Sequence, residues 1–270
     1  MSTNSPAEKL GWAALLFGVA AACVNPYLAI IPLAAYIITC LIAPLLPGTS
    51  FFLPVHSRGK TGKAFVALSF DDGPDPRTTP PLLDLLDEYQ VKATFFVTGG
   101  NIKRHAHLIT AILERGHDMG NHSRSHDIFL MFRSMSRLAA EIESVQTLLQ
   151  DFGIVPLAFR PPVGATNPKL PFALRRYGLY CVNFSCRARD RGNRAVGGIA
   201  RKILHKIRPD DIILLHDTAP PNSASVSLWL REVAAILSGL KARQLKVIRL
   251  AELINKPVMH RTKNIVVNLK

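Results

Sequence analysis

The longest uncharged segment of the chain divides it into two parts. From Gly11 to Leu46, 36 residues contain no Asp, Glu, Lys or Arg. One helical crossing of a bilayer needs about 20 apolar residues. The only charges before the segment are Glu8 and Lys9, whereas a secretory signal peptide has a basic start and a shorter apolar run. We therefore expect a tail over residues 1–10 and a membrane anchor over residues 11–46.

The anchor can be arranged in two ways. Asn25-Pro26 separates a short span, Gly11–Val24, from a full-length span, Tyr27–Leu46, and the two would form a helical hairpin. A single span with an interfacial segment is the alternative. A hairpin with the basic flank 58–63 favours the cytoplasmic face of the inner membrane, because positive residues stay inside. A single span that starts inside would place the enzyme on the periplasmic, external face.

The basic charge lies outside the anchor. The chain has a net charge of +14, and Glu8 and Lys9 cancel, so the whole excess belongs to residues 58–270. Such an excess suits anionic partners such as phospholipid headgroups or phosphorylated glycolipids. No nucleic-acid recognition motif accompanies it, so we expect no nucleic-acid partner. The four cysteines, Cys23, Cys40, Cys181 and Cys186, form no disulfide or metal pattern and favour a reducing compartment.

After a linker over residues 47–63, short apolar runs alternate with amphipathic segments. The candidate strands are Phe65–Phe70, Ala93–Val97, Asp118–Asn121, Leu157–Arg160, Leu179–Phe184, Asp211–Leu215 and Leu245–Ile248. Helices are expected between them, including Ile102–Arg115, Ser134–Phe152 and Ala195–Ile207. Strand-then-helix repetition predicts an α/β fold, a distorted (β/α) barrel of about seven strands over residues 64–256. Residues 257–270 would be a C-terminal tail.

Residues capable of chemistry stand where these strands end. Asp71 and Asp72 follow the first strand, and His122, Arg160 and His216 follow or end later ones. In a parallel barrel the carboxyl ends of the strands converge on one site. The positions of these residues therefore predict a common active site.

Two of these residues, together with His126, suit a divalent metal ion. His122 and His126 are four residues apart, so both imidazoles can lie on the same side of one turn, and Asp72 can supply a third ligand. Three protein ligands with open positions are typical of a catalytic metal. With a cation on Asp72, the adjacent Asp71 is free to act as a general base.

Together these motifs resemble the polysaccharide deacetylase family, also called the NodB-homology or carbohydrate esterase family 4 domain. Ser69-Phe70-Asp71-Asp72-Gly73 is similar to its first motif and His122-Ser123-Arg124-Ser125-His126 to its second. Phe159-Arg160-Pro161-Pro162-Val163-Gly164 is similar to the third and Leu214-Leu215-His216 to the fifth. The resemblance implies a zinc-like ion on Asp72, His122 and His126, with Asp71 as the base.

The resemblance also implies roles for the remaining motif residues. Arg160 would hold Asp71, and the Val163 backbone N–H would bind the oxyanion. His216 would protonate the leaving amine, and Leu214 would line the acyl pocket. The expected activity is metal-dependent removal of an N-acetyl or other N-acyl group from an amino sugar.

The fourth motif departs from the family pattern. Asp190 matches the acid that tunes His216, but Arg191 stands where a tryptophan is usual. Val163 likewise replaces an aromatic residue. The surrounding segment carries a cluster of arginines, Arg187, Arg189, Arg191 and Arg194. Because guanidinium groups bind phosphate through paired hydrogen bonds, Arg187 and Arg191 favour a polyprenyl-phosphate-linked sugar beside the membrane, with an N-acetylated polysaccharide as the other substrate class.

Three other functions compete with this interpretation. Two histidines and a carboxylate also form the facial triad of a mononuclear iron oxygenase, but that fold is expected to be antiparallel. A glycosidase that uses Asp71 with another acid would leave His122 and His126 unexplained. A membrane-bound glycolipid-binding protein with an inactive site is the alternative outside catalysis, and the complete set of proton-transfer and metal positions argues against it.

Overall fold

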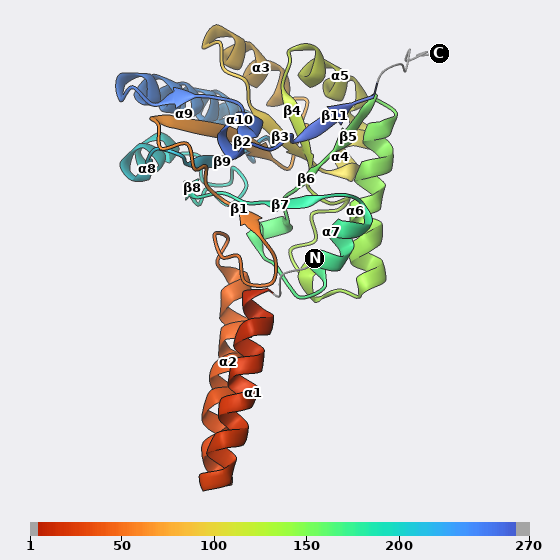
Figure 1. Cartoon of the computed structure of the whole chain (residues 1–270). Coiled ribbons are helices and arrows are strands. Elements are labelled where there is room, and N and C mark those ends of the chain that lie inside the picture. Colours follow the sequence, from red (N-terminus) through yellow and green to blue (C-terminus); the bar gives the residue numbers. More distant parts are fainter. Residues whose placement is uncertain (1–4, 263–270) are drawn as a thin grey trace.

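The computed structural model describes residues 5–262, without the side chains of residues 223 and 224. A helical hairpin projects as a stalk from an α/β domain (Figure 1). Its elements are α1 (Pro6–Val24), η1 (Pro26–Ala29), α2 (Ile30–Ile42) and η2 (Ala43–Leu45). Ser5 and Glu8 begin α1 with a reciprocal capping box. Asn25 ends it in an extended conformation and caps the next turn through its side chain.

Both helices of the stalk are long and apolar enough to cross a membrane, at Pro6–Val24 and Pro26–Leu45. Large apolar side chains remain exposed along them, among them Phe17, Ile31 and Leu41. Burial of such side chains is favourable by about 1.5–3 kcal/mol each. The stalk therefore presents an apolar surface that the domain itself does not cover.

The domain is built on a curled parallel sheet that is open along one side. Its strands are β1 (Val55–His56), β2 (Phe65–Asp71), β3 (Thr94–Val97), β4 (Asp118–Asn121), β6 (Ala158–Phe159), β7 (Tyr180–Val182), β8 (Cys186–Arg187), β9 (Ile212–His216) and β10 (Lys246–Val247). The order across the sheet is β1-β7-β6-β4-β3-β2-β9-β8, with β10 on the first residues of β2. Two further strands, β5 (Ile154–Pro156) and β11 (Met259–Arg261), pair antiparallel.

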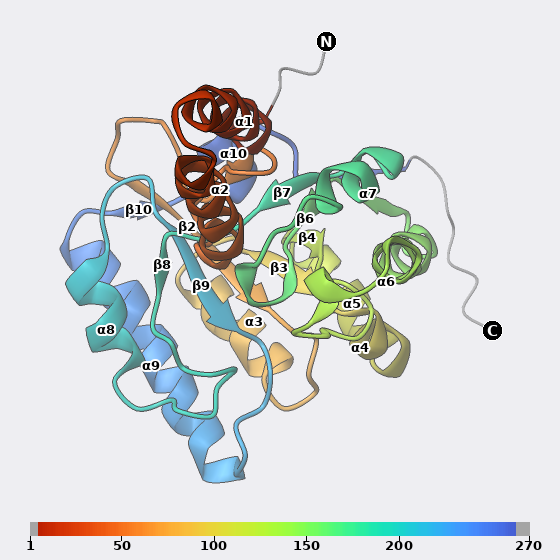
Figure 2. The ribbon, with the colours of Figure 1, turned by 90° about the horizontal axis from the view of Figure 1, so that it is seen from below.

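Helices surround the outside of the sheet (Figure 2). They are α3 (Thr79–Glu88), α4 (Gly99–Arg104), α5 (Ala106–Glu114), α6 (Met135–Gln150), α7 (Leu170–Arg176), α8 (Ile199–Lys206), α9 (Ser223–Ala242) and α10 (Leu250–Ile254). Short 3-10 turns lie at η3 (Leu130–Phe132) and η4 (Pro162–Gly164). The central strand β2 is buried from Val66 onwards, as expected for a parallel strand covered on both faces.

The predicted fold class is confirmed, with corrections to several boundaries. The expected helix 102–115 is two helices, because His105 leaves the helical conformation between α4 and α5. The expected helix 195–207 begins only at Ile199, since Gly198 is left-handed at φ 75°. The expected strand 157–160 is shortened to β6, and the separate strand β5 precedes it. The expected linker 47–63 contributes β1, which pairs with β7, and the expected tail 257–270 contributes β11; residues 263–270 lie outside the described part.

The base of the hairpin packs firmly against the domain. Ala7 and Ala43 belong to a buried cluster that also contains Phe51, Leu130 and Phe159. Backbone hydrogen bonds join the two parts, from Ala7 N to Phe51 O at 3.1 Å and from Thr166 N to Pro44 O at 3.2 Å. The hairpin base is thus held against the segment that follows β6.

Candidate active site

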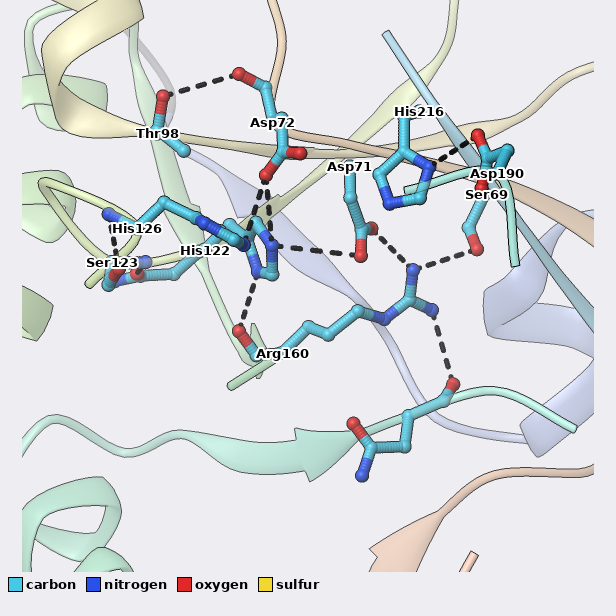
Figure 3. A network of polar contacts seen from close by, with 12 residues as sticks. Ser69, Asp71, Asp72, Thr98, His122, Ser123, His126, Arg160, Asp190 and His216 are labelled. Carbon is cyan, nitrogen blue, oxygen red and sulfur yellow. Dashed lines mark hydrogen bonds and ion pairs between the residues drawn. The ribbon is translucent and has the colours of Figure 1, made fainter. Parts of the chain in front are cut away.

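Strand register brings the reactive residues together at the carboxyl edge of the sheet. In the β2–β9 pair Asp71 lies opposite His216, and in the β4–β6 pair Asn121 lies opposite Phe159. His122 and Arg160 therefore follow neighbouring strand ends. Figure 3 shows the side chains of Asp71, Asp72, His122 and His126 close together, with the Arg160 side chain extending toward Asp71.

Asp72, His122 and His126 form a compact three-ligand cluster. Asp72 Oδ1 lies 3.4 Å from His122 Nε2 and 3.2 Å from His126 Nε2. One donor atom from each residue lies within 4.8 Å of the others. The two histidines lie in the loop after β4, in which Ser123 and His126 have positive φ. The sequence spacing of four thus brings the rings together through left-handed loop residues.

The chemistry of the cluster fits a divalent cation. Asp72 Oδ1 is buried and has no hydrogen-bond partner among the described residues, although a buried polar atom normally has one. Burial alone would raise the pKa of Asp72, but polar contact with His122 and the charges of His122 and His126 lower it below its usual value. His122 Nδ1 lies 2.7 Å from the Arg160 carbonyl oxygen, which orients Nε2 toward the cluster.

The backbone around Asp72 is held by neighbours that sequence reasoning did not identify. Asp72 has φ 74°, an uncommon conformation for a residue other than glycine. Its carbonyl oxygen accepts hydrogen bonds from Asn101 Nδ2 at 2.7 Å and Thr98 Oγ1 at 3.3 Å. Buried Asp217 lies against Gly73, the residue after Asp72, and accepts hydrogen bonds from the side chains of Thr78 and Thr79. The only feature of the sequence that points to Asp217 is its position directly after His216.

Arg160 fixes the orientation of Asp71. The buried guanidinium donates from Nη1 to Asp71 Oδ1 at 2.6 Å and to Ser69 Oγ at 2.9 Å. Its Nη2 donates to the Asn183 carbonyl oxygen at 3.1 Å, and its carbon lies 3.9 Å from the centre of the Phe96 ring. These contacts hold one carboxylate oxygen of Asp71 and leave the other 3.7 Å from His122 Nε2, facing the cluster.

His216 and Asp190 form a second pair on the other side of Asp71. His216 Nδ1 lies 2.9 Å from Asp190 Oδ2, and both residues are largely buried. Burial would lower the pKa of His216, but its contact with Asp190 and the negative charges of Asp72 and Asp71 raise it to about 9. A histidine with this pKa is protonated at neutral pH and can donate a proton.

The three groups open into one pocket of about 1000 Å³. Leu214 and Val163 line it, and Val163 has φ 54°, a strained conformation for a β-branched residue. Four arginines also line it, Arg187, Arg189, Arg191 and Arg194. No ion pair within residues 5–262 involves any of these four arginines. The nearby carboxylates contact other residues instead: Asp190 contacts His216, and Asp217 contacts Thr78 and Thr79. The residues expected at the site therefore line one cavity, except Arg160, which is buried behind Asp71 and contacts it. The roles expected of these residues stay predictions.

The chain is similar in sequence to polysaccharide deacetylases. Residues 58–182 match the family model described as polysaccharide deacetylase. A peptidoglycan-N-acetylglucosamine deacetylase of Bacillus cereus is 33% identical over 191 residues, covering 70% of this chain and 87% of that protein. A chitooligosaccharide deacetylase of Sinorhizobium fredii is 33% identical over 174 residues, covering 63% of this chain and 80% of that protein.

A solved structure shares the fold over most of the domain. The crystal structure of the Bc1960 peptidoglycan N-acetylglucosamine deacetylase, in complex with an N-oxidanyl-benzamide compound, matches with a TM-score of 0.67 and 29% identity. The match covers 76% of this chain and 94% of that chain. From the sequence match and the shared fold, the chain belongs to the polysaccharide deacetylase family.

Proposed function

We propose that this protein is a hydrolase that removes an N-acyl group, most simply N-acetyl, from an amino sugar in a polysaccharide or lipid-linked glycan. The observation that carries the proposal is the placement of a held carboxylate, Asp71, between a three-ligand cluster and a histidine paired with an acid. Amide hydrolysis needs a base for the water and an acid for the nitrogen. The similarity to peptidoglycan and chitooligosaccharide deacetylases supports an N-acetylated glycan as substrate.

Asp72, His122 and His126 would hold the metal ion. One carboxylate and two imidazoles are a ligand set typical of catalytic zinc, and three ligands leave positions open. When bound there, a divalent ion supplies Lewis acidity that polarises the amide carbonyl and lowers the pKa of water.

The proton transfers are assigned to Asp71 and His216. Asp71, held by Arg160, accepts a proton from the attacking water. His216, whose pKa of about 9 keeps it protonated at neutral pH, donates a proton to the nitrogen, so that a neutral amine leaves. Asp190 keeps the imidazole oriented. The products are a carboxylic acid and a free amino sugar.

The pocket walls position the acyl group. The backbone N–H of Val163 donates to the developing oxyanion, and a single such donor is typically worth about 3–4 kcal/mol in the transition state. Leu214 packs against the acyl methyl group. Arg187 and Arg191 line the pocket, and Arg191 stands where the family usually has a tryptophan; this positive charge supports an anionic substrate such as a lipid-phosphate-linked sugar.

The hairpin supports a membrane location. The start of α1 and the end of α2 both lie at the domain (Figure 1), so a membrane-inserted hairpin would place the domain beside the bilayer. With the basic flank after Leu46, this arrangement favours the cytoplasmic face of the inner membrane. The periplasmic face is the alternative for a chain that inserts in the opposite direction.

Two substitutions separate metal binding from catalysis. Asp71→Asn should retain the metal and lose turnover of an N-acetylglucosamine oligomer, because the base is lost and the three ligands remain. His126→Ala should lose both. Metal content by mass spectrometry and release of free amine measure the two properties. Asp84→Asn, an exposed change of the same chemistry, is the matched control. Near-normal turnover by Asp71→Asn would show that the base has been assigned wrongly.

A further inference from the structure

A second cavity lies where the curled sheet fails to close. Its volume is about 470 Å³, and it separates the two edge strands of the sheet, β1 and β8. Ser57 follows β1 on one side, and Ser185 precedes β8 on the other. Pro47 and Gly48, which follow the hairpin in the chain, form the third wall of the cavity. We call this cavity the seam groove.

The seam groove is basic, and no Asp or Glu side chain of residues 5–262 lines it. Its charged lining residues are Arg58, Arg187, Arg189 and Lys206. Arg58 pairs with Asp211 at 2.6 Å, whereas no ion pair among residues 5–262 uses Arg187, Arg189 or Lys206. Arg187 is half-buried and lies over the Phe184 ring at 5.1 Å. Like charges held this close repel one another, so an anion in the groove would be attracted by all of them.

Burial and the neighbouring charge of Arg189 lower the pKa of Arg187. The direction of this shift is what unpaired, crowded positive charges produce. The charge of Asp190 acts in the opposite direction but is the smaller influence. The shift agrees with the geometry, in which the guanidinium lies over the Phe184 ring and forms no ion pair within residues 5–262.

The seam groove adjoins the catalytic pocket. Phe184, Arg187 and Arg189 line both cavities. At its other end the groove reaches Pro47 and Gly48, directly after the second apolar helix ends at Leu45. A ligand that occupies both cavities would thus extend from the catalytic residues to the level at which the hairpin leaves the domain.

We propose that the seam groove binds the phosphate of a sugar joined to a lipid through a phosphodiester, while the sugar occupies the catalytic pocket. This inference rests on the proposed deacetylase function and specifies its substrate class. The phosphate lies against Arg187, Arg189 and Lys206, and the lipid chain continues beside the hairpin into the membrane. Arginine suits this position because its planar fork pairs with two phosphate oxygens.

The test compares two substrates in phosphatidylcholine vesicles. One is N-acetylglucosamine joined by a phosphodiester to a polyprenyl chain, and the other is a neutral N-acetylglucosamine oligomer. The variant R189Q/K206Q should lower the ratio of kcat/KM for the phospholipid substrate to that for the oligomer by at least about tenfold, since a single hydrogen bond between charged groups contributes about a factor of ten or more. The control R201Q/R231Q removes two exposed charges from the outer helices and should keep the ratio within about twofold.

Binding to an inactive background separates this inference from the proposed function. In Asp71→Asn, R189Q/K206Q should weaken binding of the phospholipid-linked sugar by a similar factor, whether or not turnover occurs. Lys206→Gln alone, an exposed change at the end of α8, should give a smaller shift in the same direction and covers the case in which the double variant misfolds.

Three results would overturn the inference. The first is an unchanged ratio with unchanged binding. The second is an equal loss on both substrates. The third is an effect that appears only when phosphatidylglycerol is added, which would assign the groove to bulk anionic headgroups. Binding that depends on the groove without any release of amine would instead refute the deacetylase function.

Discussion

The pairing of His216 with Asp190 should set the basic limb of the pH–activity profile. Asp190 Oδ2 lies 2.9 Å from His216 Nδ1 and is the largest single influence that raises the pKa of this histidine to about 9. Asp190→Asn keeps the size and removes the charge. The pKa of His216 should then fall toward its ordinary value of 6.5, and the basic limb should move to lower pH.

The size of the effect follows from the two pKa values. At pH 8 a histidine with a pKa of 9 is about nine-tenths protonated, and one with a pKa of 6.5 is about 3% protonated, a difference of roughly 30-fold. At pH 6 the same two fractions differ by less than about twofold. The loss in kcat/KM should therefore be much larger at pH 8 than at pH 6. A bound cation would lower the pKa of His216 in the wild type and in Asp190→Asn alike. The basic limbs of the two profiles would move in the same direction, so the difference between the two proteins remains.

The raised pKa of His216 also makes the stability of the native state depend on pH. Because the folded-state pKa of His216 lies above the unfolded value, the pair stabilises the native state fully below pH 6.5, and this contribution is lost as the pH rises through about 9.

The assay for the activity prediction is kcat/KM for an N-acetylglucosamine oligomer from pH 5.5 to pH 9.5, with Asp84→Asn as control. An unmoved basic limb, or the same fractional loss at every pH, would refute the assignment of His216 as the proton donor tuned by Asp190.

Three further predictions test other parts of the molecule. Arg160→Met should destabilise the domain by about 3–5 kcal/mol, because it leaves Asp71 buried without its charge partner, and thermal unfolding in detergent should show a smaller loss for Arg160→Lys. Treatment with a chelator should abolish amine release, and zinc should restore it in the wild type but not in His126→Ala; full activity after complete removal of metal, checked by mass spectrometry, would contradict the metal assignment. Alkaline phosphatase fused after Lys270 should be inactive if the hairpin leaves the domain in the cytoplasm, and an active fusion would exclude that topology.

The sequence predicts the site better than it predicts the elements that carry it. Strand ends are visible in a sequence when an apolar run stops at a polar residue, as at Asp71, His122 and His216. Parallel pairing then brings those ends together without further information, because register fixes which residues are neighbours. The cluster of Asp72, His122 and His126 and its neighbour Asp71 are therefore predictable from the amino-acid sequence alone.

Contacts between distant segments could not be predicted in this way. β1 has two residues in a segment rich in proline and glycine, and only its pairing with Cys181 and Val182 makes it a strand. Asn101 and Asp217 support the site from a helix and from the end of β9, and neither shows a distinctive spacing. Short edge strands and supporting residues of this kind depend on tertiary partners rather than on local propensity.

The junction between the hairpin and the domain also bears on the shape of the site. Asn183 Nδ2 donates to the Pro47 carbonyl oxygen at 2.7 Å and to the Gly164 carbonyl oxygen at 3.0 Å, while the Asn183 carbonyl accepts from Arg160. One buried side chain thus joins the end of the hairpin to the turn that contains Val163. A β-branched residue at φ 54° costs on the order of 1–3 kcal/mol and persists only where its surroundings hold it. Pro47 packs against Gly164, where an added Cβ would lie 3.1 Å from it. The residues that follow the hairpin therefore help to hold the strained turn that contains Val163, which lines the pocket, so the hairpin is joined to the part of the structure that shapes the site.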